Sequence, residues 1–123
     1  VFGNELMRQS LDAIIHPAVK TYILEEIRKQ RQAGCRLLVI EAALLLEEHY
    51  EEFCNNVWYI HTDAEIRIQR LMDSRGYTRE KAESIIARQG SEEVFSKHSD
   101  YVIINNGDLK TTWKQIEEGI KLL

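Results

Sequence analysis

Polar residues follow three short apolar runs of the chain, and this placement marks positions where a ligand could be bound. The apolar runs cover residues 37–40, 57–60 and 101–104. The segments that follow them, each beginning with a polar residue, are 41–47, 61–63 and 105–108. If the runs are parallel strands, their carboxyl ends meet at one edge of a sheet, which is where open α/β sheets bind ligands. These three segments therefore form the candidate site.

The first segment combines an acid with an apolar stretch. Glu41 follows four apolar residues, the position in which a nucleotide-binding enzyme places a carboxylate near a metal or its waters. A solvated acid at the end of a strand has the same surroundings, so both interpretations stay open. Leu44 and Leu45 begin a run that is too apolar for an idle loop. This run is either part of a core or one wall of a ligand cleft.

Arginines are concentrated between residues 67 and 88. The planar guanidinium binds phosphate oxygens bidentately, so arginines on a closing segment would clamp a triphosphate. Exposed arginines are also common on helices, and their spacing does not separate the two alternatives. The basic residues concerned are Arg67, Arg70, Arg75, Arg79, Lys81 and Arg88.

The third segment contains a glycine next to amide side chains. Asn105-Asn106-Gly107 could bring backbone close to a flat base, because glycine has no side chain to obstruct the approach. A plain turn, with Asp108 capping the next helix, is an equally good explanation. Neither zinc chemistry nor a hydrolase triad is supported, because no histidine has metal-ligand spacing and no serine lies in a G-x-S-x-G motif.

The phosphate-binding loop of nucleotide kinases is missing from the 123 residues. Such a loop needs a glycine followed by Lys and then Ser or Thr, and none of the six glycines is followed by Lys. The chain begins with Val1 rather than methionine. We therefore expect a processed or truncated N-terminus, with the missing features encoded upstream.

Helices are expected between the apolar runs. Apolar residues from Leu6 to Ile15 fall on one helical face, and a break is expected at His16 because Pro17 disfavours helix in the residue before it. A second amphipathic helix would follow and end at Gly34.

Further helix starts are indicated after the second run. Thr62 and Glu65 have the spacing of a capping box, and Thr78 and Asp108 are suited to cap two later helices. Helices that alternate with strands apolar on both faces predict an α/β domain with a parallel sheet. Three such strands make a thin sheet, so we expect it to be incomplete in this chain.

Composition limits the possible partners and environment. The apolar share of 44% and the charged share of 29% suit one globular domain, and the net charge of -4 argues against a nucleic-acid surface. No apolar run approaches the roughly 20 residues that span a membrane. We expect Cys35 and Cys54 to be buried thiols in a reducing cytoplasm. Exposed strand edges would favour self-association.

Taken in order, these motifs resemble those of the dephospho-coenzyme A kinase family, over nearly the whole chain. Each motif is weak alone, whereas the ordered set is fairly specific. Ala43 departs from the pattern, since the family usually has proline there. The motifs are LDAIIHP at 11–17, LVIEAALLLE at 38–47, Arg70-Leu71-Met72 with Gly76-Tyr77-Thr78 and Gln89, and DYVI at 100–103 with Asn105-Asn106-Gly107.

The resemblance implies a three-layer P-loop NTPase fold, similar to nucleotide kinases, with an incomplete parallel sheet. The segments would be a helical substrate-binding part, core strands, lid helices, and the last strand with the C-terminal helix, at 1–34, 35–62, 63–98 and 99–123. It also implies transfer of the γ-phosphoryl group of ATP, with Mg²⁺, to the ribose 3′-hydroxyl of dephospho-coenzyme A, the last step of coenzyme A biosynthesis.

Site residues are carried over by matching position. Arg70 would be the lid arginine that stabilises the transferring phosphate. Asn105 and Gly107 would lie beside the adenine of ATP. The acceptor substrate would be bordered by His16, Glu41, Leu44 and Leu45, and no residue is assigned to a metal.

The family's P-loop and catalytic aspartate belong to a segment that precedes Val1, so the chain alone is expected to be inactive. Two alternatives stay open at this point. The chain could belong to another P-loop nucleoside or nucleotide kinase, or it could be a non-catalytic binding module that lacks the P-loop.

Overall fold

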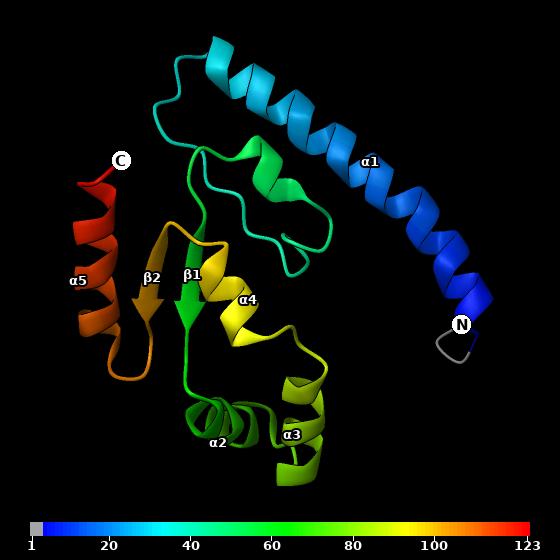
Figure 1. The fold of residues 1–123 in the computed structure, drawn as a ribbon, viewed down its shortest axis with the longest axis vertical. Helices are drawn as coiled ribbons and strands as arrows, with labels where there is room; N and C mark the ends of the chain where they lie inside the picture. Colours follow the sequence, from blue (N-terminus) through cyan, green and yellow to red (C-terminus); the bar gives the residue numbers. More distant parts are fainter. Residues whose placement is uncertain (1–3) are drawn as a thin grey trace. The chain divides into compact units, whose positions relative to one another are not determined.

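The computed structural model describes residues 4–123, which form two units that divide between Cys54 and Asn55. Most of the first unit is one long helix, α1 (Glu5–Gln32), which is drawn in blue and cyan in Figure 1. The side chain of Asn4 caps its start by accepting from the amides of Leu6 and Met7, at 3.1 and 3.2 Å. Gly34, with φ of 76°, lies just after its end, as predicted.

The predicted helix break at His16 is wrong, because α1 continues through Pro17 without interruption. The φ of proline is close to the helical value, but Pro17 lacks the amide that would bond the Ala13 carbonyl, and its ring crowds that carbonyl. Water can satisfy the Ala13 carbonyl instead, because none of the described α1 residues is buried.

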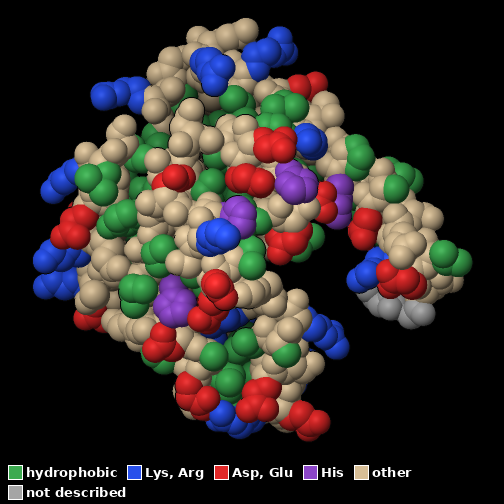
Figure 2. All heavy atoms as spheres, in the orientation of Figure 1, with side chains coloured by type: hydrophobic (Ala, Val, Ile, Leu, Met, Phe, Trp, Pro, Cys, Tyr) green, Lys and Arg blue, Asp and Glu red, His purple; other side chains and the backbone are tan. Residues whose placement is uncertain are grey.

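The predicted apolar face of α1 is uncovered within its unit. Leu6 is 75% exposed and Ile14 is 71% exposed. Figure 2 shows hydrophobic side chains at the surface of this helix, interspersed with charged ones. The small core of the first unit lies elsewhere, around the 3-10 helix η1 (Tyr50–Phe53), where Tyr50 is buried and stacks on Phe53 at 6.3 Å.

The first predicted strand is also wrong. Residues 37–40 have no strand assignment, and Leu37 and Val39 are 51% and 76% exposed. A strand requires a neighbour whose amides and carbonyls complete its hydrogen bonds. Among the described residues only two strands pair, and both lie in the other unit, so residues 37–40 stay unpaired.

The second unit contains the sheet. Strands β1 (Trp58–His61) and β2 (Tyr101–Ile104) pair in parallel, with Trp58 opposite Tyr101 and His61 opposite Ile104. The second and third predicted strands and their parallel pairing are therefore confirmed. Helices α2 (Ala64–Arg75), α3 (Arg79–Ala87) and α4 (Glu92–Lys97) form the crossover, and α5 (Leu109–Ile120) ends the chain. In Figure 1, α4 lies beside β1, α5 lies beside β2, and α2 packs on α3.

Apolar packing in the second unit concerns a few residues. Ile68 of α2, Ala82 of α3 and Ile103 of β2 are buried. The rings of Trp58 and Tyr101 lie 5.1 Å apart, on neighbouring strands. Of the helices in this unit, α5 packs on β2, α4 packs on β1, and α2 and α3 pack on each other.

The capping predictions have different outcomes. Thr78 caps α3 by accepting from the Lys81 amide, and Asp108 caps α5 by accepting from the Thr111 amide, as predicted. The capping box at Thr62 is wrong. Asp63 is the residue before α2 and its side chain makes no cap bond, while the Thr62 hydroxyl donates to the Asn105 carbonyl at 3.2 Å. The Thr62 hydroxyl therefore bonds a carbonyl at the end of β2 instead of capping α2.

Candidate functional site

The carboxyl ends of β1 and β2 are joined by three hydrogen bonds. The Asn105 amide donates to the His61 carbonyl at 2.7 Å, and the Thr62 hydroxyl donates to the Asn105 carbonyl at 3.2 Å. The Asp63 amide donates to Oδ1 of Asn106 at 2.8 Å. We call residues 61–63 and 105–107 the strand-end rim. The two predicted site segments in this unit thus lie side by side.

Arg70 approaches the strand-end rim from α2. Its Nη2 lies 3.4 Å from the Gly107 carbonyl, and the side chain belongs to an exposed residue. A guanidinium has five N–H groups, so this contact leaves donors for a bound anion. The structure therefore brings together three predicted site residues, Arg70, Asn105 and Gly107.

Another arginine of the same cluster has a structural role. Arg79 pairs with Glu65 and Glu83, at 2.6 and 2.9 Å. The hydrogen bond that Arg79 donates to Glu65, followed by the one that it donates to Glu83, raises the pKa of the Arg79 guanidinium. These contacts connect α3 to α2, so Arg79 has acidic partners and is not available as a phosphate clamp in this conformation.

A histidine–aspartate pair lies within the rim. Nε2 of His61 is 2.8 Å from Oδ1 of Asp63. This hydrogen bond, with a smaller contribution from the Asn106 side chain, lowers the pKa of the Asp63 carboxyl below its ordinary value of 3.8. Ionised Asp63 is thus favoured by the folded state and holds the His61 ring against the strand end.

The Asp63 pKa predicts acid sensitivity. A carboxyl with a lowered folded pKa stabilises the fold above its unfolded pKa, and this contribution disappears as pH falls through the folded value. We expect the free energy of unfolding to decrease below pH 3.8 and to decrease less in Asp63→Asn. Urea unfolding at a series of pH values measures this difference.

Asp73→Asn is the matched control, since it makes the same charge change at an exposed acid that bonds Gln69. It should keep the acid-dependent loss of the wild type. Parallel stability curves for Asp63→Asn and the wild type below pH 3.8 would contradict the assignment to Asp63.

The remaining predicted site residues lie in the first unit. His16 Nδ1 is 2.7 Å from Oε1 of Glu48, and its Nε2 is 3.8 Å from Oδ1 of Asp12. Glu41 and Leu44 are exposed, and Leu45 is half-buried. Glu48 was missed by sequence reasoning because its 32-residue separation from His16 follows no helical or strand period. It gives His16 a fixed ring orientation.

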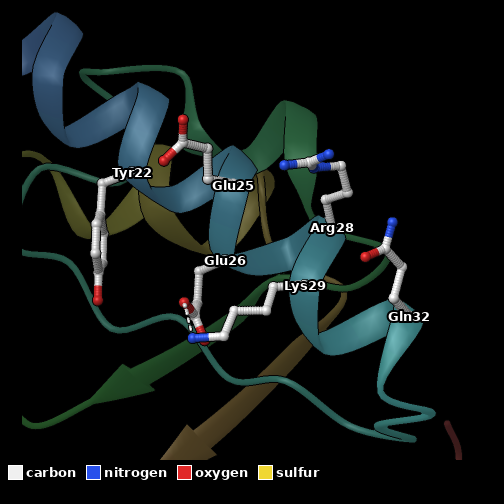
Figure 3. Close-up of a pocket in the computed structure, with 6 residues that line it drawn as sticks. All are labelled: Tyr22, Glu25, Glu26, Arg28, Lys29 and Gln32. Carbon is white, nitrogen blue, oxygen red and sulfur yellow. Dashed lines mark ion pairs between the residues drawn. The ribbon is translucent and has the colours of Figure 1, made fainter.

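A hollow in the first unit is lined by residues of α1 alone (Figure 3). Nζ of Lys29 lies 3.8 Å from Oε2 of Glu26 across it. None of the predicted site residues lines this hollow, so it does not extend the candidate site. Its residues are Tyr22, Glu25, Glu26, Arg28, Lys29 and Gln32.

Metal and membrane sites were sought in residues 4–123. No three or more His, Cys, Asp or Glu side chains in this range are grouped so that they could hold a metal ion. None of the helices in the same range is both long and apolar enough to cross a membrane.

The parallel strands, their helical crossover and the polar strand-end rim define an α/β protein with a candidate binding site at the carboxyl ends of its strands. The family model described as dephospho-CoA kinase matches residues 1–111. The chain belongs to the dephospho-CoA kinase family, a family of transferases, as the ordered motifs predicted.

Curated relatives have similar sequences. The dephospho-CoA kinase of Symbiobacterium thermophilum is 34% identical over 117 residues, which cover 95% of this chain and 49% of the relative. That of Geobacillus kaustophilus is 34% identical over 116 residues, covering 94% and 58%. The chain thus spans about half to three-fifths of the length of these relatives.

Solved structures support the fold. The crystal structure of TT1252 from Thermus thermophilus has a TM-score of 0.74 at 25% identity, covering 100% of this chain and 63% of that one. The dephospho-CoA kinase from Campylobacter jejuni has a TM-score of 0.69 at 23% identity, covering 98% and 59%. The predicted P-loop NTPase fold class, similar to nucleotide kinases, is confirmed.

Proposed function

We propose that this chain is the acceptor-binding, lid and C-terminal core portion of a dephospho-coenzyme A kinase. The enzyme would transfer the γ-phosphoryl group of ATP to the ribose 3′-hydroxyl of dephospho-coenzyme A. The observation that carries the proposal is the approach of Arg70 to Gly107, in a chain whose family match covers residues 1–111. That contact joins the proposed phosphate-binding group to the proposed base-binding loop.

The second unit supplies the ATP side of this proposal. A Cβ added at Gly107 would meet no heavy atom within 4 Å, so the backbone there is open to a flat adenine ring. Asn105 is held at the end of β2 by the His61 and Thr62 bonds. Arg70 would stabilise the charge on the transferring phosphoryl group, where preorganised donors have their largest effect.

The first unit supplies the acceptor side. Glu48 orients His16 through Nδ1, and Nε2 is 3.8 Å from Oδ1 of Asp12, too far for a hydrogen bond, so Nε2 can face a polar group of dephospho-coenzyme A. Leu44 and Leu45 offer apolar surface to the acceptor, and Glu41 offers an exposed carboxylate. The roles of these four residues depend on the family resemblance.

Mg²⁺ is part of the proposal through ATP rather than through this chain. Mg²⁺ is usually held by one or two carboxylates together with substrate phosphates and waters. Residues 4–123 contain no cluster of three or more potential ligands, so we assign no Mg²⁺ ligand to this chain and derive no step from the ion.

The setting proposed for the enzyme is cytoplasmic, with dephospho-coenzyme A and ATP as partners. Cys35 and Cys54 are free thiols, which suits a reducing compartment. The expectation that both are buried is wrong, because Cys35 is exposed and Cys54 is half-buried. The net charge of -4 disfavours nucleic acid, and no membrane partner is proposed. Exposed apolar residues of α1 and the unpaired residues 37–40 favour self-association of the isolated chain.

Two assays test the proposal. The 123-residue chain should not phosphorylate dephospho-coenzyme A with ATP and Mg²⁺, because its sequence has no phosphate-binding loop. Robust turnover by the pure chain would contradict this. In binding assays the chain should prefer dephospho-coenzyme A to nucleoside monophosphates. A preference for a monophosphate would favour another nucleotide kinase, and failure to bind either acceptor would count against an acceptor-binding role.

A further inference from the structure

The outer edge of β2 is completed by a side chain. In a parallel strand, alternate residues direct their amides and carbonyls to opposite neighbours. The Asn105 amide bonds the His61 carbonyl of the β1 strand, so the backbone groups of Ile104 face the other way. Gln115 of α5 meets both of them. Its Oε1 accepts from the Ile104 amide at 2.9 Å, and its Nε2 donates to the Ile104 carbonyl at 2.8 Å.

Gln115 thus takes the place of a peptide group of a neighbouring strand, and it is itself held in position. The Tyr101 hydroxyl donates to the Gln115 carbonyl at 2.9 Å. Nε2 of Gln115 also lies 3.3 Å from the Thr111 carbonyl, one turn earlier in α5. The side-chain amide is therefore fixed at its backbone and along its length.

A second α5 residue holds the next position of the rim. Thr112 is 6% exposed, and its hydroxyl donates to Oδ1 of Asn105 at 2.7 Å. Ile104 and Asn105 are consequently both attached to α5, directly before the loop that ends at Gly107. Arg70 contacts the loop from its other end, at the Gly107 carbonyl.

We propose that Gln115 is a positioning residue that sets the conformation of residues 105–107 and thereby the position of the bound nucleotide base. This inference depends on the proposed function for the identity of its ligand. The exposed position of Ile104, at 45%, distinguishes positioning from simple stabilisation. Water can replace the two Gln115 bonds at an exposed edge, so their loss costs little stability, whereas water cannot hold the loop in one place.

The test compares Gln115→Met with the wild type, using the 123-residue chain and ATP as the probe. Methionine keeps the length and apolar stem of glutamine but cannot form either bond. We expect faster hydrogen exchange at the Ile104 amide and a dissociation constant for ATP raised about 10-fold, as measured by NMR titration of residues 104–107. Gln115→Glu retains the acceptor for the Ile104 amide and should give intermediate values.

Gln69→Met is the matched control, because the Gln69 amide bonds an exposed side chain, Asp73, on α2. It should change neither measurement. Urea unfolding of each variant verifies that the second unit is folded. Faster exchange at Ile104 with unchanged ATP affinity in Gln115→Met would overturn the positioning role. If ATP leaves the wild-type signals of residues 104–107 unmoved, the proposed ATP side fails, and this inference fails with it.

Discussion

Replacing Arg70 with alanine is expected to lower the rate constant of phosphoryl transfer by roughly 10³-fold, in the kinase to which we propose this chain belongs. Arg70 is exposed on α2 and has a single contact, to the Gly107 carbonyl, among its side-chain hydrogen bonds in the described residues. Its guanidinium is therefore free to donate hydrogen bonds to the phosphoryl oxygens as negative charge develops on them. Single-turnover kinetics with dephospho-coenzyme A and ATP measure this step.

The loss should appear in kcat more than in KM, because the interaction strengthens in the transition state. Arg70→Lys should recover only part of the rate, since an ammonium lacks the planar fork. Arg8→Ala is the control, because Arg8 lies on α1 and pairs with Glu5 at the surface. If Arg70→Ala kept at least a third of the wild-type rate, Arg70 would have no catalytic role.

Replacing Gly119 with alanine is expected to destabilise the second unit by about 1–3 kcal/mol, as overpacking does in protein cores. A Cβ at Gly119 would lie 2.7 Å from Cε1 of Tyr101 and 2.8 Å from Cη2 of Trp58. These rings pack on each other, so neither can move without disturbing the other. At an exposed helical site the same substitution is expected to raise the free energy of unfolding, because alanine has the higher helix propensity.

The midpoint of urea unfolding, followed by tryptophan fluorescence, measures the effect. Gly107→Ala is a useful comparison for stability, since an added Cβ there meets nothing within 4 Å. We expect its midpoint to remain close to that of the wild type. An unchanged or higher midpoint for Gly119→Ala would contradict overpacking and would mean that α5 and the two rings adjust to the added Cβ without loss of stability.

Sequence patterns correctly predicted two kinds of element. The first kind depends only on neighbouring residues, and the second kind pairs with another element within the described residues. Strands β1 and β2 were predicted from their apolar runs, and each pairs with the other. Residues 37–40 have the same pattern but no partner strand in the described residues, so residues 37–39 remain exposed and Ile40 is only half-buried. The helix break predicted at His16 was also wrong, because a local pattern alone did not decide the structure there. A proline constrains only its own turn, and an uninterrupted helix on both sides outweighs one missing bond.

The candidate site was predictable in position but not in its supporting contacts. The strand ends at residues 61–63 and 105–107 were identified from the rule for parallel sheets, and they do lie together. The partners of this rim and of His16 are distant in sequence and belong to no motif. Glu48, Thr112 and Gln115 therefore became visible only in the folded chain. The division into functional segments and the roles of the site residues stay predictions.

The close packing of Trp58 at Gly119 also determines what optical experiments on this chain will detect. Both tryptophans, Trp58 and Trp113, lie in Asn55–Leu123, whereas the longest helix, α1, lies in Val1–Cys54. Indole emission will therefore follow one unit, whereas circular dichroism at helical wavelengths will report on both, because 28 α-helical residues lie in the first unit and 39 in the second. Two melting curves that do not coincide would show that unfolding of the chain is not two-state, as expected if the two units unfold separately.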